Sequence, residues 1–304
     1  MSNDVPYLLR GMNPTHPVSS GLKSSSRYLN NAAFRDWVAF ILLKRNGPDI
    51  PPQAEMYDFL KFIPEVYDLA LIEELFTRER KRLPKLDAWF NERYVSTYSK
   101  PDLAQFAPET VGGTFYKYLA RPGFEVEIVP WTKVPNKTQL DYFNLRAFQN
   151  HDIEHVLIGA GFDYIGELIP YYFRINTYFK VFSPELAGQL GSFQLFGALR
   201  YTVRTMLHYP ECWPAANEAI GTGMQIAAQS TPFLFEKLEP YFALPVAEAR
   251  QRLGVRGVKE MDTERLSDIW AERIMPSEPI ETIEASRPMA EDEVADATAA
   301  RASD

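Results

Sequence analysis

The sequence predicts an all-α protein, built as a single multi-helix domain between a flexible N-terminal lead and a disordered acidic C-terminal tail. Prolines repeatedly stand where first helical turns would begin and glycines where helices would end, whereas strand-like alternation is scarce. The chain has 304 residues, 46% of them hydrophobic and 13% aromatic, which is enough for one large core.

The first 120 residues are expected to form five helices. They span about residues 31–45, 53–62, 65–81, 85–94 and 110–120, and Pro122 with Gly123 ends the last one. Residues 124–134, FEVEIVPWTKV, have β-branched and alternating character, but Pro130 limits them to an irregular or edge element. An extended connector is therefore predicted between the two halves of the chain.

The next helix begins with a clear capping signal. Thr138, followed three residues later by Asp141, suggests an N-cap. The helix should run to about residue 160, where Gly159 and Gly161 end it. This predicted helix carries the residues of the chain that are best suited to metal binding or catalysis.

Three further helices follow in the prediction. The first spans residues 183–208 and opens with a capping serine, a first-turn proline and a glutamate. Pro214 and Pro245 open two more, the second of which ends at Gly254. The folded body, residues 29–275, then closes near Trp270.

The charge of the chain is concentrated at its C-terminal end. The formal net charge is −8, and residues 276–304 hold eight acidic residues against two arginines. These residues have too few large apolar side chains to offset the entropy of ordering, so the tail should be disordered. The remaining body is nearly neutral and has no Lys/Arg-rich run, so nucleic acid is not expected as a partner.

Residues 1–28 are read as a flexible lead-in, because they lack the features of a secretory signal or of an organelle presequence. The longest apolar run, residues 37–43, is far shorter than the roughly 20 residues needed to span a bilayer. We expect a bacterial cytoplasmic protein that is peripheral to the inner membrane. Residues 31–45 could contact the bilayer surface, although an ordinary core-facing helix is the preferred interpretation. A homodimer is the default expectation.

The single cysteine, Cys212, excludes an internal disulfide and any multi-cysteine metal site. A nucleophilic thiol would need an activating base nearby. His208 lies four residues before Cys212, but Pro210 interrupts the helix that would align them. A catalytic cysteine is not predicted.

A metal-binding pattern stands on the predicted helix at residues 151–155, HDIEH. His151 and His155 are four residues apart, so both imidazoles project from one helical face. Asp152 can coordinate an ion or orient a histidine, and Glu167 lies past the glycine break, where a reversing chain could return a carboxylate to the same face. Two histidines at this spacing also occur by chance. They are nevertheless two of only four in the chain, with an acid between them.

The string HDxxH, eleven intervening residues and a glutamate, written here HDIEHVLIGAGFDYIGE, resembles the signature of the Coq4 family of ubiquinone (coenzyme Q) biosynthesis proteins. The resemblance extends upstream through PETVGGTFYKYL and downstream through AIGTGMQIAAQSTPFLFEKLEPYFALPVAEARQRLGV. It covers about residues 100–255 and leaves out both termini.

The resemblance implies an all-helical protein that helps to build ubiquinone, where a polyprenylated hydroxybenzoate-derived ring loses its carboxylate and gains oxygen. It implies that His151, His155 and Glu167 are catalytic metal ligands, and that Asp152 is a fourth ligand, an orienting residue or a proton acceptor. Zinc is the first choice of divalent ion, with iron, manganese or cobalt as alternatives. The implied partners are the polyprenylated precursor and other ubiquinone biosynthesis enzymes.

Several residues near the motif have two interpretations. A polyprenyl tail needs an apolar channel, which nearby aromatics could line, although we favour core packing for them: Tyr171, Tyr172, Phe173, Tyr178, Phe179, Phe182, Phe193 and Phe196. Arg174, Arg200 and Arg204 could meet a carboxylate or a lipid headgroup, but we expect surface salt-bridge partners. Glu154 should point away from the two histidines and be solvated or salt-bridged.

Three other functions remain open on the sequence alone. The chain could be a non-catalytic organiser that binds metal and prenyl lipid within a biosynthetic enzyme complex. A metal-dependent hydrolase of the HD type would need further distant histidine and aspartate ligands, and only His16 and His208 remain as histidines. A helical interaction protein without metal is the third alternative.

Overall fold

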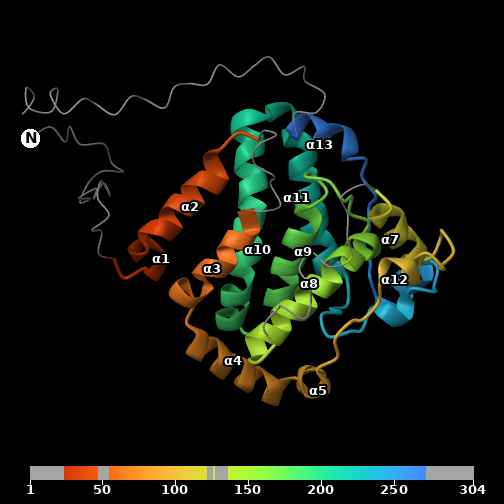
Figure 1. The fold of residues 1–304 in the computed structure, drawn as a ribbon, viewed down its shortest axis with the longest axis horizontal. Helices are drawn as coiled ribbons and strands as arrows, with labels where there is room; N and C mark the ends of the chain where they lie inside the picture. The colour runs from red at the N-terminus through yellow and green to blue at the C-terminus, as the bar shows by residue number, and fades with distance from the viewer. Residues whose placement is uncertain (1–23, 47–54, 122–125, 127–135, 272–304) are drawn as a thin grey trace, which may run out of the picture.

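The structure, a computed structural model, describes residues 24–46, 55–121, 126 and 136–271. Within these residues it contains thirteen α-helices and no strand, so the predicted all-α class is confirmed (Figure 1). The helices are α1 Arg27–Asn30, α2 Ala32–Leu43, α3 Glu55–Val66, α4 Leu69–Arg82, α5 Pro84–Glu92, α6 Lys100–Leu103, α7 Val111–Leu119, α8 Gln139–Ile158, α9 Leu168–Val181, α10 Pro184–His208, α11 Trp213–Gln229, α12 Val246–Leu253 and α13 Glu264–Trp270. Two 3₁₀ turns are also present: Pro210–Cys212 precedes α11, and Glu239–Tyr241 lies between α11 and α12.

Three predicted segments fall largely outside the described residues. They are most of the N-terminal lead, all of the acidic tail at residues 276–304, and the connector at residues 124–134 apart from the buried Val126. The structure adds four helices that the sequence did not predict: α1, α6, α9 and α13. Within the part of the chain that is described, no helix is both long enough and apolar enough to cross a membrane.

The predicted break between the helices at residues 53–62 and 65–81 lies too early in the chain. Helix α3 continues through Pro64 to Val66, and α4 starts only after Asp68, whose carboxylate accepts the Leu71 amide. The helix persists because Phe59 and Val66, two turns apart on one face, are both fully buried. Burial of that face outweighs the one backbone hydrogen bond that the proline removes.

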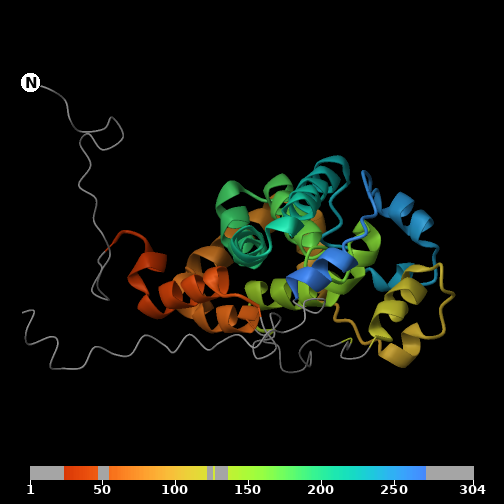
Figure 2. The ribbon, with the colours of Figure 1, turned by 90° about the horizontal axis from the view of Figure 1, so that it is seen from above.

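Two buried clusters lie along three long central helices. One joins α2–α5 to the N-terminal half of α8, the C-terminal part of α9 and the start of α10, and the other joins the remaining parts of these three helices to α7, α11, α12 and α13. Figures 1 and 2 show α8, α9 and α10 in the middle of the molecule, with the early helices at one end and α7 and α12 at the other. Because the same three helices serve both clusters, the described body is one continuous unit.

Three arginines that we expected on the surface are buried. Arg174, Arg200 and Arg204 are at most 4% exposed. Arg204 donates to the Ile41 carbonyl at 2.6 Å, and Arg200 donates to the Tyr201 hydroxyl at 2.7 Å. The surface prediction was wrong because these guanidinium groups find hydrogen-bond partners inside the fold. Arg174 and Arg204 bond to groups on other helices, which sequence spacing does not reveal.

Helix α11 packs closely on α9 at Gly223. A Cβ at position 223 would lie 2.4 Å from the Ile169 carbonyl oxygen, whereas a Cβ at Gly221 would meet nothing within 4 Å. Gly223→Ala should therefore lower the free energy of unfolding by roughly 1–3 kcal/mol. The matched Gly221→Ala should raise it by up to about 1 kcal/mol, because alanine is the better helix former. Urea unfolding of both variants checks this, and equal shifts would contradict the close packing.

Candidate metal centre

Helix α8 positions the two histidines of the motif. It starts with a capping box, in which the Thr138 hydroxyl accepts the Asp141 amide and the Asp141 carboxylate accepts the Thr138 amide, both at 3.0 Å. It ends at Gly159, whose φ of 72° is the left-handed conformation that glycine adopts without strain. The predicted boundaries of this helix are confirmed.

The structure brings His151, His155 and Glu167 together. The Nε2 atoms of the two histidines lie 3.4 Å apart, and Glu167 places one carboxylate oxygen 3.4 Å from His151 Nε2 and the other 3.5 Å from His155 Nε2. These three side chains form the one group in the described part of the chain with the composition and spacing of a metal site. His155 is fully buried, whereas the side chains of His151 and Glu167 are 17% and 23% exposed, so the group is open on one side.

The orientation of His155 is set by the loop that follows α8. Its Nδ1 lies 3.0 Å from the Gly161 carbonyl oxygen, which can only accept, so Nδ1 carries a proton and Nε2 presents its lone pair to the group. The Phe162 ring stacks on His155 at 4.5 Å and on Tyr118 at 4.0 Å. Carbonyl and ring together fix the imidazole, as in many metal sites.

The same loop returns Glu167 to the histidines. Asp163 accepts the Gly166 amide on its carboxylate at 2.9 Å and the Glu167 amide on its backbone carbonyl at 2.9 Å, which makes a tight turn directly before the ligand. The sequence interpretation missed Asp163. An aspartate three residues before a glycine is the turn signal that would have revealed it.

Asp152 is not a member of the three-residue group. It lies close enough for His151, His155 and Glu167 to influence its charge, and desolvation raises the pKa of its carboxyl above the usual range against the lowering effect of both histidines. Its prediction as a ligand or orienting residue therefore stays a prediction, while the structure places it beside the group as a carboxyl that holds a proton more tightly than usual.

Electrostatic coupling within the group is strong. Burial by itself lowers the pKa of His155, but the carboxylates of Glu167 and Asp152 outweigh it, so the net pKa is raised. Burial by itself raises the pKa of Glu167, but the two histidines hold it well below the usual range. Two imidazoles facing one ionised carboxylate make a site that attracts a cation, whether a proton or a metal ion.

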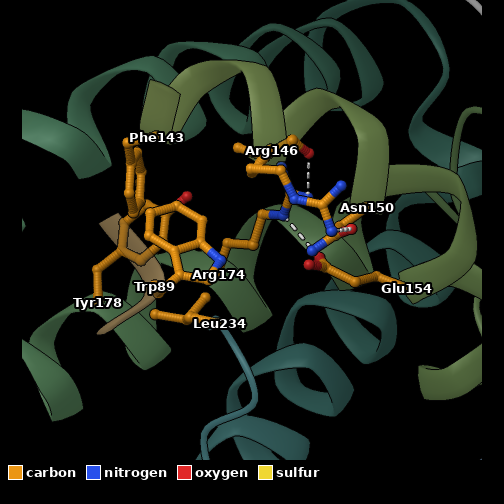
Figure 3. A pocket seen from close by; sticks show the side chains of 9 residues that line it. Trp89, Phe143, Arg146, Asn150, Glu154, Arg174, Tyr178 and Leu234 are labelled. Atoms are coloured by element: carbon orange, nitrogen blue, oxygen red, sulfur yellow. Dashed lines mark hydrogen bonds and ion pairs between the residues drawn. The ribbon is translucent and has the colours of Figure 1, made fainter. Parts of the chain in front are cut away.

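Glu154, the second acidic residue between the two histidines, forms a buried ion pair with Arg174. Glu154 is buried and accepts from Arg174 Nε at 2.7 Å, and Arg174 also donates to the Ala147 carbonyl at 2.6 Å. The expected salt bridge is therefore present, but it is not solvated. Figure 3 shows these two residues with Arg146 and Asn150 around a small cavity of about 10 Å³, which has room for roughly one water molecule. This cavity is too small to be a substrate site.

The aromatic side chains that could have lined a channel pack in the two cores instead. Four of them are buried and three are partly buried against the same clusters, while Phe179 is 53% exposed. Cys212 is fully buried, its thiol lies 3.3 Å from the Leu266 carbonyl oxygen, and burial raises its pKa to about 11. Such a thiol is not an activated nucleophile.

Comparison with known proteins agrees with the motif. The family model described as "Coenzyme Q (ubiquinone) biosynthesis protein Coq4" matches residues 93–257, just over half of the chain. Among solved structures, a candidate ubiquinone biosynthesis protein from Nostoc punctiforme has a TM-score of 0.54 and 21% sequence identity, over 74% of this chain and 95% of that chain. At this identity the likeness is one of fold. A search of curated proteins finds no match. The resemblance inferred from the sequence is confirmed: the chain belongs to the Coq4 family and has a role in coenzyme Q (ubiquinone) biosynthesis.

Proposed function

We propose that this protein is a metal-dependent enzyme that removes the ring carboxylate of a polyprenylated hydroxybenzoate-type precursor of ubiquinone. The observation that carries the proposal is the grouping of His151, His155 and Glu167. Their two Nε2 atoms lie 3.4 Å apart, and one donor atom from each of the three residues lies within 4.8 Å of the others. Ligands bound at the usual zinc distances in a tetrahedron are about 3.3 Å apart. The two imidazole nitrogens are at this spacing, and Glu167 lies near enough to supply the third ligand. Three protein ligands would leave the fourth position open.

An open fourth position is typical of catalytic rather than structural zinc sites. The exposed fractions of His151 and Glu167 support an opening on the solvent side of the group, because His155 is fully buried. The donor set of two imidazoles and one carboxylate suits zinc, iron, manganese or cobalt. Zinc is our first choice.

When bound, the ion would supply Lewis-acid stabilisation of the negative charge on the ring substituent that binds to it. In the decarboxylation step the bond between ring and carboxyl carbon breaks, carbon dioxide leaves, and the electron pair stays on the ring carbon. We assign proton transfer in this step to Asp152, because it lies beside the two histidines and Glu167 and because desolvation raises the pKa of its carboxyl. Addition of oxygen at the same carbon would require an oxidant such as dioxygen.

The pH dependence of metal binding follows from the coupling within the group. Glu167 and Asp152 raise the pKa of His155 above its ordinary value of about 6.5. Near and below this raised pKa, a metal ion must displace a proton from His155 in order to bind. The apparent zinc affinity should therefore increase as the pH rises from about 6 to 8, with protons released on binding. The ionised Glu167 contributes nothing to this change, because its pKa is lowered. Calorimetric titration in buffers of different ionisation enthalpy measures the release, and an affinity independent of pH would contradict it.

The test of the function uses a polyprenylated 4-hydroxybenzoate that carries ¹³C in its carboxyl group. The protein is loaded with zinc, iron or manganese and incubated with this compound in detergent micelles, with and without air. Release of labelled carbon dioxide by the wild-type protein, but not by Glu167→Gln, is the expected result. Binding of the compound without release would instead identify a lipid-binding organiser of the pathway.

A further inference from the structure

The metal-binding loop, residues 159–167 between α8 and α9, contacts a part of the chain that lies beyond the region matched by the family model. The match ends at residue 257, and α13 follows it. Residues 163–166 of the loop between α8 and α9 hydrogen-bond to Thr263 and Ser267 of this later segment. Figure 1 shows α13 at the top of the view, beside the upper ends of α10 and α11.

Asp163 is the point at which this segment meets the loop. Its Oδ2 accepts from the Thr263 hydroxyl at 2.5 Å and its Oδ1 accepts from the Ser267 hydroxyl at 2.5 Å. The same Oδ1 accepts the Gly166 amide, and the Asp163 carbonyl accepts the Glu167 amide. The two hydroxyls therefore hold the residue that forms the turn before Glu167.

The contacts of Ser267 and Gly161 extend this support to both sides of the loop. The Ser267 hydroxyl also accepts the Ile165 amide at 2.9 Å. A Cβ at Gly161 would lie 2.2 Å from Asp163 Oδ2 and 2.9 Å from the Thr263 hydroxyl, so position 161 is packed directly against the cluster. Because the Gly161 carbonyl orients His155, the cluster supports a second ligand as well.

Thr263 uses its hydroxyl in an unusual way for its position. It is the N-cap residue of α13, where a threonine normally accepts an amide of the first turn, yet its side chain makes no capping hydrogen bond. It donates to Asp163 instead. The hydroxyl thus serves the loop rather than the helix that it begins.

The C-terminal segment that contains Thr263 and Ser267 is anchored to the core by contacts that do not involve the predicted metal ligands. Trp270 is fully buried, its indole Nε1 donates to the Thr205 hydroxyl at 3.0 Å, and its carbonyl accepts from Asn46 at 2.7 Å. Its ring also lies 4.6 Å from that of Tyr164 in the loop. A rigid support on the far side of Asp163 can therefore restrict where Glu167 is placed.

We infer that Thr263 and Ser267 are positioning residues that hold Glu167 and His155 in the metal-binding arrangement through Asp163. This inference rests on the proposed metal centre. It gives the C-terminal segment beyond the family-matched region a direct part in the site, although neither hydroxyl contacts the ion. Residues that hydrogen-bond a metal ligand directly usually change metal affinity by about 10–100-fold when they are removed. Thr263 and Ser267 act one step further away, through Asp163, so the effect of removing both should fall at the lower end of this range.

The experiment compares zinc affinity, by competition with a chromogenic chelator, in Thr263→Val/Ser267→Ala and in wild type. The control is Thr222→Val, because Thr222 is also buried and its hydroxyl contacts Met261 of the same segment at 3.7 Å, but not the loop. The double variant should bind zinc about 10-fold more weakly than wild type, the lower end of that range. Thr222→Val should bind it unchanged, and Thr263→Ser, which keeps the hydroxyl, should be close to wild type.

The spectrum of a bound cobalt ion distinguishes a positioning role of the two hydroxyls from a role in stability alone. The visible spectrum of the cobalt-loaded protein should change in the double variant and stay unchanged in Thr222→Val, even where thermal unfolding shows similar losses of stability. Wild-type zinc affinity and an unchanged cobalt spectrum in the double variant, or in Thr263→Val alone should the double variant not fold, would overturn the inference. If wild type binds neither zinc, cobalt, iron nor manganese, the proposed metal centre itself fails and the positioning role falls with it.

Discussion

His155→Ala should abolish stoichiometric zinc binding and, with it, the release of carbon dioxide from the labelled precursor. His155 is fully buried, and its Nε2 lies within 3.5 Å of donor atoms of both His151 and Glu167. Loss of a partner that only orients a ligand already costs about 10–100-fold in affinity, so loss of the ligand should cost more than about 100-fold. Zinc competition and the labelled-carbon assay measure the two effects.

The matched control for this variant is His208→Ala. His208 also makes one hydrogen bond through Nε2, to the Leu43 carbonyl at 2.9 Å, but it stands at the end of α10 and is not a member of the metal-binding group. His208→Ala should keep its zinc and its turnover. A folded His155→Ala protein that retained both would show that the group is not the site.

Arg174→Met should lower the free energy of unfolding by about 3–5 kcal/mol, because it leaves the buried Glu154 carboxylate without its partner. Both side chains of this pair are at most 5% exposed, and Arg174 also donates to the Ala147 carbonyl. Desolvation lowers the pKa of Arg174 and the Glu154 carboxylate raises it, with a net rise, as expected for a charge that is stabilised by its partner. Urea unfolding measures the loss.

The double variant Arg174→Met/Glu154→Leu distinguishes the net stabilisation by the ion pair from the loss of stability when one buried charge is left unpaired. Apolar replacement of both partners of a buried ion pair is often nearly neutral, so the double variant should recover most of the stability. The exposed pair Arg78–Glu185 is the control, since Arg78→Met should cost less than about 1 kcal/mol. Similar losses in the free energy of unfolding for Arg174→Met and Arg78→Met would show that breaking the buried pair costs no more stability than breaking the exposed one.

Features that are local in sequence could be predicted, and the metal-binding helix shows why. Thr138, Asp141 and Gly159 act within one turn of either end of α8, so their capping roles follow from residue type and spacing alone. The spacing of His151 and His155 likewise places both on one face. Glu167 is different, because its place beside the histidines depends on how the chain reverses after Gly161. The sequence allowed this reversal, and the resemblance to the family supported it, but residue spacing alone could not fix it.

Features that depend on distant packing could not be predicted. Arg204 was expected on the surface, but it is buried by groups more than 150 residues away in sequence, the carbonyl of Ile41 and the side chain of Asn46. Helix α13 was missed because it is short and its N-cap hydroxyl bonds to Asp163 rather than to the helix itself. Neither arrangement leaves a periodic pattern along the chain, since each is stabilised by tertiary contacts rather than by local propensity.

The most direct test of the account is the metal content of the purified full-length protein, measured by elemental mass spectrometry beside the variant His151→Ala/His155→Ala/Glu167→Gln. If these three side chains form a metal centre, the wild-type protein should carry or take up one divalent ion per chain, and the variant should carry none while remaining helical by circular dichroism. Equal metal content in the two proteins, or none in wild type after incubation with zinc, iron and manganese, would contradict the account.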